Sequence, residues 1–191
     1  MVAFPRIPED LYRLPPGVPF EVRNRESRRY LEIINEQCET SDYAYSWGFT
    51  IYRTVFTSEL DATFPVAMEH FNERARWSII SSVKSDADTE PDDELLRRYQ
   101  NHIIEDKSLD SASTETIGAR FAEYVEEQVG PDYWGDNTRY RICLVIDQKA
   151  LDQLLQMPDL SDMGTEKWYL CCTVVTCGEQ DEYNGGDYFW F

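Results

Sequence analysis

The sequence predicts an α+β fold of ferredoxin-like type, in which a four-stranded, mainly antiparallel sheet carries helices on one face and an inserted helix. Two observations favour this fold. Segments with the two-residue period of strands alternate with segments of helical period in the order β-α-β-α-β-α-β. Residues 103–110 also resemble residues 144–152, which fits the two related halves of a ferredoxin-like fold. The alternative is a flavodoxin-like doubly wound sheet, but no glycine-rich phosphate loop follows the first strand.

The length of 191 residues fits one domain with its own hydrophobic core. Residues 1–46 are predicted to form a proline-rich leader and a short helix, over 26–38, that lie against the body of the protein. Residues 47–191 are predicted to form a single α+β domain. The apolar stripe of the short helix would consist of Tyr30, Ile33, Ile34 and Cys38.

Residues 47–56 are predicted to form the first and central strand. This stretch, Trp-Gly-Phe-Thr-Ile-Tyr-Arg-Thr-Val-Phe, is mostly aromatic and β-branched and carries a single charge, at Arg53. Such a composition suits a strand that is packed on both faces. Further strands are predicted over about 99–105, 139–147 and 167–177, and the aromatic tail 187–191 is expected to dock on the body.

Three helices are predicted after the first strand, over about 59–76, 113–129 and 148–156. In the first two, apolar residues recur at spacings of three and four, which places them on one face of a helix. The acidic segment 84–94 is predicted to be a loop. The buried faces would contain Phe64, Ala67, Met68, Phe71 and Ala75 in the first helix and Ile117, Phe121, Val125 and Val129 in the second.

The sequence is strongly acidic, with 36 aspartates and glutamates against 18 lysines and arginines and a formal net charge of -18. Nucleic acids and anionic membranes are bound through lysine and arginine, so neither partner is expected. The N-terminus lacks the apolar stretch of a signal peptide, and no apolar run has membrane-spanning length. Five cysteines without a CxxC pair favour buried thiols in a reducing compartment. We therefore expect a soluble, cytoplasmic protein.

Arg53 is the residue of the first strand that packing alone does not explain. A buried arginine needs a carboxylate or a bound anion. Asp106 and Asp147 are predicted to end neighbouring strands and are therefore candidate partners. An internal ion pair is the simpler interpretation. In the functional interpretation Arg53 holds an oxyanion while Tyr52, His102 or one of the aspartates moves a proton.

No cofactor or metal is predicted. The sequence contains no HExxH motif, no CxxC pair and no aspartate-rich loop, so the common metal sites have no signature. His102 precedes Glu105 and Asp106, which would form a partial metal site only on a helix. The cysteines of segment 167–177 are interpreted as core residues.

The motifs around the first strand resemble those of a large group of fungal proteins with no agreed activity. The resemblance rests on WGFTIYRT at 47–54, on Ile-Glu-Asp at 104–106, and on the Leu-Asp and Ala-Ser pairs that follow before a helix containing Arg-Phe. It covers roughly residues 45–150 and implies a fungal source, but it supplies no catalytic residues. Ser111 occupies a position where the resemblance leads us to expect glycine.

Two functions remain open from the sequence. The first is a binding or interaction protein that recognises a protein partner or a small apolar molecule, because aromatic residues make up 14% of the chain. The alternative is a cofactor-free enzyme of fungal secondary metabolism, such as a cyclase, isomerase or dehydratase, with an aromatic-lined cleft. A homodimer is possible by analogy with other ferredoxin-like sheets.

Overall fold

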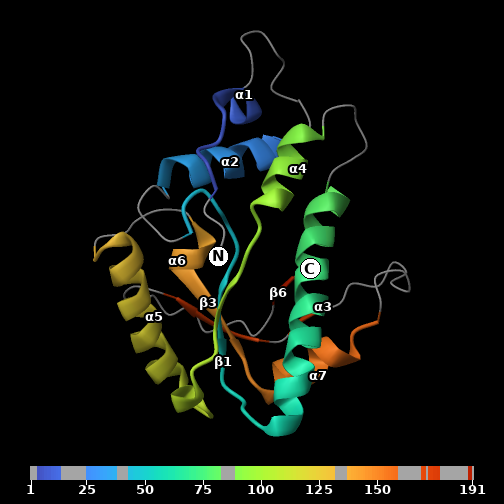
Figure 1. The fold of residues 1–191 in the computed structure, drawn as a ribbon, viewed down its shortest axis with the longest axis vertical. Coiled ribbons are helices and arrows are strands. Elements are labelled where there is room, and N and C mark those ends of the chain that lie inside the picture. The colour runs from blue at the N-terminus through green and yellow to red at the C-terminus, as the bar shows by residue number, and fades with distance from the viewer. Residues whose placement is uncertain are drawn as a thin grey trace.

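The centre of the molecule is a four-stranded sheet in the order β2-β1-β3-β5 (Figure 1). β1 pairs in parallel with both β2 and β3, and β5 pairs antiparallel with β3. The structure is a computed structural model that describes residues 4–13, 25–37, 43–82, 89–131, 137–158, 169–170, 172–176 and 189–190. The strands of this sheet are β1 (Thr50–Arg53), β2 (His102–Ile104), β3 (Ile142–Ile146) and β5 (Thr173–Thr176).

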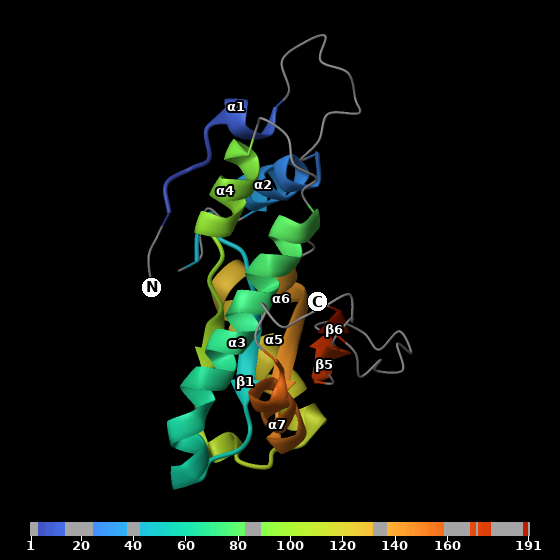
Figure 2. The same cartoon turned by 90° about the vertical axis from the view of Figure 1, so that its right-hand side faces the viewer.

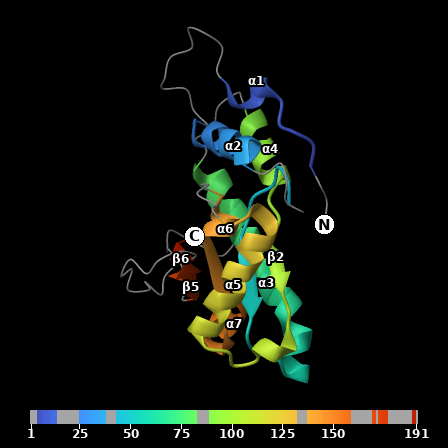
Figure 3. The ribbon, with the colours of Figure 1, turned by 90° about the vertical axis from the view of Figure 1, so that its left-hand side faces the viewer.

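The ferredoxin-like prediction is wrong, because this sheet is mostly parallel and helices cover both of its faces. α3 (Ser58–Ser82) and α7 (Gln148–Gln156) lie on one face (Figure 2), and α5 (Thr114–Val129) lies on the other (Figure 3). The connection from β1 to β2 and the connection from β2 to β3 cross the sheet in opposite directions. Since such crossovers are right-handed, their helices must lie on opposite faces.

Successive residues of β1 therefore enter two different cores. Ile51 contacts the α3 and α7 side, together with Leu144 of β3, and Tyr52 contacts the α5 side. All four residues of β1 are buried as a result. The predicted stripe of α3 is confirmed, since each of its five apolar residues is buried, and so are Ile117, Phe121 and Val125 of α5.

A third core lies where the parallel strands begin, under α1 (Glu9–Tyr12), α2 (Arg25–Gln37) and α4 (Glu90–Arg97) (Figure 1). The predicted stripe of α2 is partly wrong: Ile34 is buried, but Tyr30 is 54% exposed and Leu31 takes its place. Cys38 lies outside the described residues. The core consists of Ile7, Tyr12, Leu31, Ile34 and Leu95.

Helix α4 begins inside the segment that was predicted to be a loop. Residues 83–88 lie outside the described part of the chain, but Glu90 already opens the helix, with Pro91 in its first turn. Proline is tolerated there because the first turn of a helix has no partner for its N–H groups.

The helix ends next to Arg98, a fully buried arginine whose Nε lies 2.6 Å from Glu94. Its Nη1 donates hydrogen bonds to the carbonyls of Pro5 and Tyr45, so it fastens the leader to the body.

Several strands are shorter than predicted. Regular pairing in the first strand covers Thr50–Arg53, and Trp47 forms an isolated parallel bridge with Tyr99. The segment predicted as a strand over 139–147 opens with one helical turn, α6 (Thr138–Arg141). The predicted strand 167–177 is divided between β5 and β4 (Tyr169–Leu170), and β4 pairs with β6 (Phe189–Trp190) of the tail.

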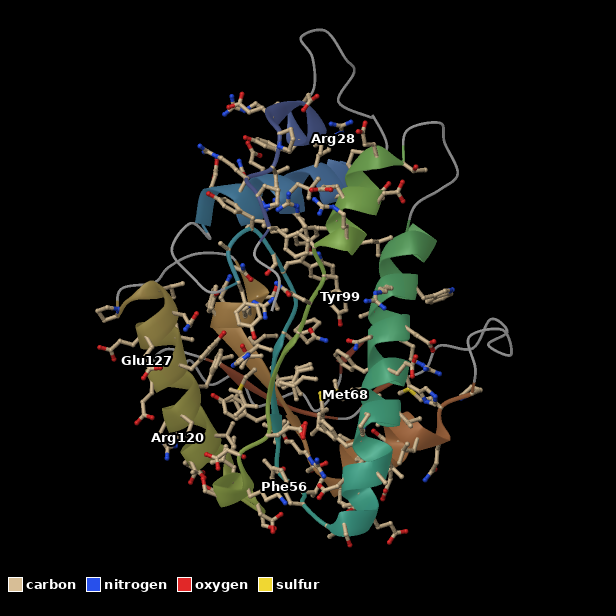
Figure 4. All side chains as sticks on the ribbon, viewed as in Figure 1. Arg28, Phe56, Met68, Tyr99, Arg120 and Glu127 are labelled. Carbon is tan, nitrogen blue, oxygen red and sulfur yellow. The ribbon has the colours of Figure 1, made fainter. Side chains whose placement is uncertain are left out.

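One side of the long helix α3 is buried, with Phe64, Met68 and Phe71, and the other is exposed, with Glu69, Glu73 and Arg76. In Figure 4, Met68 lies on the side of α3 that faces the strands, and Tyr99 lies between the strands and this helix. The hydroxyl of Tyr99 donates to the side chain of Asn72 on α3, at 3.2 Å.

Among the described residues, no helix combines the length and the apolar character that crossing a membrane requires.

Candidate functional site

Three of the predicted site residues lie at one edge of the sheet. Arg53, Asp106 and Asp147 follow or end β1, β2 and β3, and the carboxyl ends of these parallel strands share an edge. The ion-pair partners of Arg53 are nevertheless different residues from those predicted. Its Nη2 lies 2.5 Å from Asp61, and its Nη1 lies 3.2 Å from Glu105.

The side chain of Arg53 is completely engaged in the structure. Only 3% of it is exposed, and its Nε donates to the carbonyl of Val55 at 2.8 Å. The guanidinium carbon lies 4.6 Å from the ring centroid of Phe56, which Figure 4 labels at this end of the molecule, and 4.5 Å from that of Phe64. Each nitrogen of Arg53 donates to a protein oxygen, so the buried guanidinium is satisfied within the fold by two partly exposed carboxylates and one backbone carbonyl.

The two aspartates of this edge act as helix caps. Asp106 accepts a hydrogen bond from the backbone N–H of Ser108 at 2.9 Å, and this bond lowers the pKa of its carboxyl group. Asp147 accepts from the backbone N–H of Ala150 at 2.8 Å and begins α7. Both geometries are those of N-terminal capping residues.

Tyr52 belongs to the core on the α5 side of the sheet. It is 1% exposed, and burial is the main reason why its pKa is raised above the ordinary 10.0, with the nearby Cys143 thiol adding to the effect. A tyrosine with a raised pKa stays protonated at neutral pH. Tyr52 is therefore a core residue whose hydroxyl stays protonated at neutral pH.

His102 lies at the opposite end of β2, in a cluster of rings that the sequence did not predict. Its Nδ1 forms a hydrogen bond with the hydroxyl of Tyr43, which precedes β1. Its ring stacks on Tyr124 of α5, with centroids 4.8 Å apart and an angle of 13° between the planes. We name this cluster the polar aromatic centre. Its members are Tyr43, His102, Tyr124, Arg139 and Tyr140.

Arg139 supplies the positive charge of the polar aromatic centre. It is fully buried, and its guanidinium carbon lies 4.0 Å from the ring centroid of Tyr43. Its Nη2 donates to the carbonyl of Gln100 at 2.5 Å. The side chain of Thr50 on β1 donates to the carbonyl of Arg139 at 3.0 Å, which fixes the helical turn α6 against the sheet. A cation over the face of a tyrosine ring is attracted by the negative charge density of that face, so Arg139 and Tyr43 stabilise each other.

The polar aromatic centre is buried on its inner side and reaches solvent on its outer side. Tyr43, Arg139 and Tyr140 are buried, whereas His102 and Tyr124 are partly exposed. Burial is the main reason why the pKa of Tyr124 is raised above its ordinary value of 10.0, and the neighbouring Tyr140 adds to this shift. The hydroxyl of Tyr124 therefore stays protonated and lies near Thr50. The centre combines tyrosine hydroxyls, an imidazole and a guanidinium with aromatic faces.

Among the predicted site residues, the structure brings only His102 into this centre. Sequence reasoning missed Tyr43, Tyr124, Arg139 and Tyr140 because they come from a loop, a long helix and a single helical turn. Arg139 carried the one usable signal, since it stands within a segment predicted to be a buried strand, as Arg53 does. Nothing in the sequence pattern connects it with His102 or with the aromatic residues.

Other reactive groups of the described residues are dispersed. Cys143 contacts the core on the α5 side, and Cys172 contacts the core on the α3 and α7 side, so the sheet separates the two thiols. Within the ranges that the structure describes, no group of three or more histidine, cysteine, aspartate or glutamate side chains is arranged to hold a metal ion. The polar aromatic centre is distinguished by bringing an imidazole, a guanidinium and three tyrosine rings together around a partly exposed histidine.

Comparison of the chain with models of protein families, with curated proteins and with solved structures finds no match. The geometry of the polar aromatic centre and the chemistry of its side chains are therefore the features of this chain that indicate a function.

Proposed function

We propose that this protein binds a small molecule with a flat ring at the polar aromatic centre. The observation that carries the proposal is the position of His102, which is partly exposed, stacked on Tyr124 and hydrogen-bonded to the buried Tyr43. Binding sites for small molecules combine aromatic surface with a few fixed polar groups, and this centre offers both. The ring of the ligand would extend the stack, and the imidazole would fix its orientation.

The proposed binding site is the polar aromatic centre and not the surroundings of Arg53. An anion at that position would have to displace Asp61 or Glu105, since both carboxylates already contact the guanidinium. Displacing a carboxylate from a buried arginine costs its charge-assisted hydrogen bond. The polar aromatic centre requires no such exchange, because stacking adds contacts on the partly exposed rings without removing the existing ones.

A cofactor-free enzyme, of the isomerase, cyclase or dehydratase type, is the second candidate. The hydrogen bond between Tyr43 and His102 favours it, because these two side chains are common proton donors and acceptors in catalysis. Such an enzyme would use the same ring-binding surface, so the first question is whether a ring binds there.

We also propose that the protein is cytoplasmic and that it has a fungal source. The first is supported by five cysteines without a CxxC pair, and by Cys143 and Cys172 being buried in separate cores. The second is supported by the motifs at 47–54 and 104–106.

The proposal is tested by titrating the protein with 4-nitroanisole, a flat and uncharged probe, while the aromatic resonances are followed by NMR. We expect the resonances of His102 and Tyr124 to shift, and we expect Tyr124→Leu to weaken binding by about tenfold, the loss of one stacking contact. The matched control is Trp77→Leu, because Trp77 is 40% exposed on α3, on the other face of the sheet. Equal binding by Tyr124→Leu and the unmodified protein would overturn the proposal.

A further inference from the structure

We propose that the outer edge of β2, residues 101–105, binds an extended and positively charged segment of another protein, which pairs with β2 as a further strand of the sheet. The proposal goes beyond the ring-binding function and does not depend on it. It assigns an interaction surface and the chemistry of its partner, an extended backbone that carries lysine or arginine.

β2 is an edge strand of the central sheet. The strand order is β2-β1-β3-β5, so β2 pairs with β1 on one side and with no other strand among the residues that the structure describes. Figure 1 looks onto this side of the sheet, where the yellow-green ribbon of β2 passes in front of β1, between α5 and α3. Such an edge presents backbone N–H and C=O groups that another extended chain can bind.

The outward backbone groups of β2 belong to alternate residues. The N–H of His102 donates to the carbonyl of Phe49 at 2.8 Å, so His102 and Ile104 turn their backbone groups toward β1. The N–H and C=O of Ile103 therefore point away from β1, and the residues two positions before and after it continue the row. Within the described ranges, the backbone of Ile103 has no hydrogen-bond partner on that side.

Asn101 holds the start of this edge in place. Its Oδ1 accepts a hydrogen bond from the N–H of Phe49 at 2.8 Å, and its Nδ2 donates to Asn72 of α3 and to the hydroxyl of Tyr99, both at 2.8 Å. These bonds engage the side chain and leave the backbone of Asn101 at the edge. An edge that is already ordered loses little conformational freedom when a partner strand binds.

The side chains beside the edge offer apolar contact to a partner strand. Ile103 contacts the core on the α3 and α7 side, Ile104 contacts the core on the α5 side, and both are partly exposed. Neighbouring strands bring the side chains of facing residues into contact, so an added strand would cover both isoleucines. β-branched residues in the partner suit this position.

Charge determines which partner fits. Four exposed carboxylates surround the carboxyl end of β2, namely those of Asp61, Glu105, Asp106 and Asp110. The cations among them are the buried Arg53 and Lys107, so two negative charges remain in excess. The whole chain has a net charge of -18, so a second copy would be repelled, whereas lysine or arginine would be attracted.

Hydrogen exchange at the edge, followed by NMR, is the first test. Without a partner, the N–H of Ile103 should exchange about tenfold faster than that of Ile104, which the parallel register directs toward β1. The probe is the peptide acetyl-Lys-Thr-Val-Thr-Val-Thr-Lys-amide, and its addition should slow exchange at Ile103. Equal protection of the two N–H groups without peptide would show that this chain already covers the edge, and a peptide that does not bind would equally overturn the proposal.

Two further peptides separate strand pairing from charge. The same peptide with N-methyl groups on its five central residues keeps its charge and side chains but lacks their backbone donors, so it should bind about tenfold more weakly. A peptide with glutamate in place of both lysines should also bind about tenfold more weakly. Equal binding of the methylated and unmethylated peptides would reduce the contact to general attraction between a cation and an acidic protein, which contradicts the proposal.

A matched pair of variants places the contact on β2. Ile103→Pro removes the outward N–H without removing a hydrogen bond of the sheet, which edge strands tolerate, and it should abolish binding of the lysine peptide. Ile103→Val keeps the donor and should bind the peptide as the unmodified protein does. Peptide binding that persists in folded Ile103→Pro would place the contact elsewhere and overturn the proposal.

Two outcomes remain to be separated. If Ile103→Pro does not fold, the comparison of the methylated and unmethylated peptides on the unmodified protein decides the question. Sedimentation tests the alternative occupant, a second copy of this chain. A dimer of the unmodified protein that Ile103→Pro converts to a monomer would assign the edge to that second copy and overturn the proposed basic partner.

Discussion

Gly48 stands so close to the backbone of Gln100 that a Cβ atom on residue 48 would lie 2.2 Å from the Gln100 carbonyl oxygen. Its φ of +147° also lies in the region that favours glycine. The Gln100 backbone is held from both sides, since its N–H donates to Trp47 and its carbonyl accepts from Arg139. This contact joins the segments that lead into β1 and β2, immediately before His102.

The first prediction follows from this contact. Gly48→Ala should lower the free energy of unfolding by about 3 kcal/mol, because the backbone of Gln100 has to move away from the new methyl group. Denaturant unfolding measures the change. Gly130→Ala is the control, since Gly130 also has a positive φ, of +88°, but its Cβ would meet nothing within 4 Å. It should cost about 1 kcal/mol. Similar losses in both variants would show that the segments before β1 and β2 separate easily.

Arg53 is expected to contribute stability rather than chemistry. Arg53→Met should lower the free energy of unfolding by about 1–2 kcal/mol, because the buried guanidinium loses its hydrogen bonds to Asp61, Glu105 and the Val55 carbonyl, while the two carboxylates left behind are partly exposed. Arg120→Met should change it by less than about 0.5 kcal/mol, since the ion pair of Arg120 with Glu123 is exposed. Both values come from denaturant unfolding. If Arg53→Met retained full stability yet lost probe binding, Arg53 would have to be placed in the functional site after all.

Ser111 carries a backbone strain that glycine would remove. Its φ is +55°, in the left-handed region, while its N–H donates to the Thr54 carbonyl at 2.9 Å. Ser111→Gly should therefore raise the free energy of unfolding by about 0.5–1 kcal/mol. Ser113→Ala should lower it by about 1 kcal/mol, because Ser113 caps α5. Thermal unfolding distinguishes the two signs, and a loss of stability in Ser111→Gly would contradict the strain argument.

The pair formed by Glu94 with Arg98 should weaken in acid. Burial opposes ionisation of Glu94, but hydrogen bonds from Arg97 and Arg98 outweigh it and lower its pKa below the ordinary 4.5. A carboxyl whose pKa is lower in the folded state stabilises the protein above its unfolded pKa, and that contribution is lost as pH falls through the folded value. Glu94→Gln should therefore be less stable than the unmodified protein at neutral pH, and the gap should narrow below about pH 4.5.

The control for that pH series is Glu123→Gln. Glu123 forms an ion pair with Arg120 in which both side chains are exposed, so its removal should shift the unfolding curve little at any pH. A gap between Glu94→Gln and the unmodified protein that stays constant down to strongly acidic pH would show that the ionised carboxylate is not what stabilises this region.

The helices were predictable because their buried apolar residues recur at the helical spacing of three and four. The faces of α3 and α5, with Phe64, Phe71 and Phe121, are buried as expected. The direction of the strands was not predictable from period two alone, because parallel and antiparallel strands share it. The first strand did carry a signal, since a run without polar alternation, such as the mostly aromatic and β-branched residues 47–56, is typical of parallel sheets covered on both faces.

The candidate site was less predictable than the fold. The interpretation of Arg53 as an ion-pair residue matches the structure, but Asp61 and Glu105 replaced the expected partners. Asp61 lies in the first turn of α3, which begins close to the end of β1, and strand periodicity says nothing about such a turn. Tyr43 and Tyr124 contact His102 through tertiary packing alone, so no local sequence pattern predicts these contacts.

The central position of β1 also has a consequence for the order of folding. Its partners are residues 102–104 and 142–146, so the strand has no neighbour to pair with until much of the chain has been synthesised. Pairings between distant segments are slow to form, and an unpaired apolar strand is prone to aggregate meanwhile. Nascent chains that end before β3 should therefore engage chaperones through the segment around Ile51, and release from them should follow the emergence of Ile142–Ile146 from the ribosome.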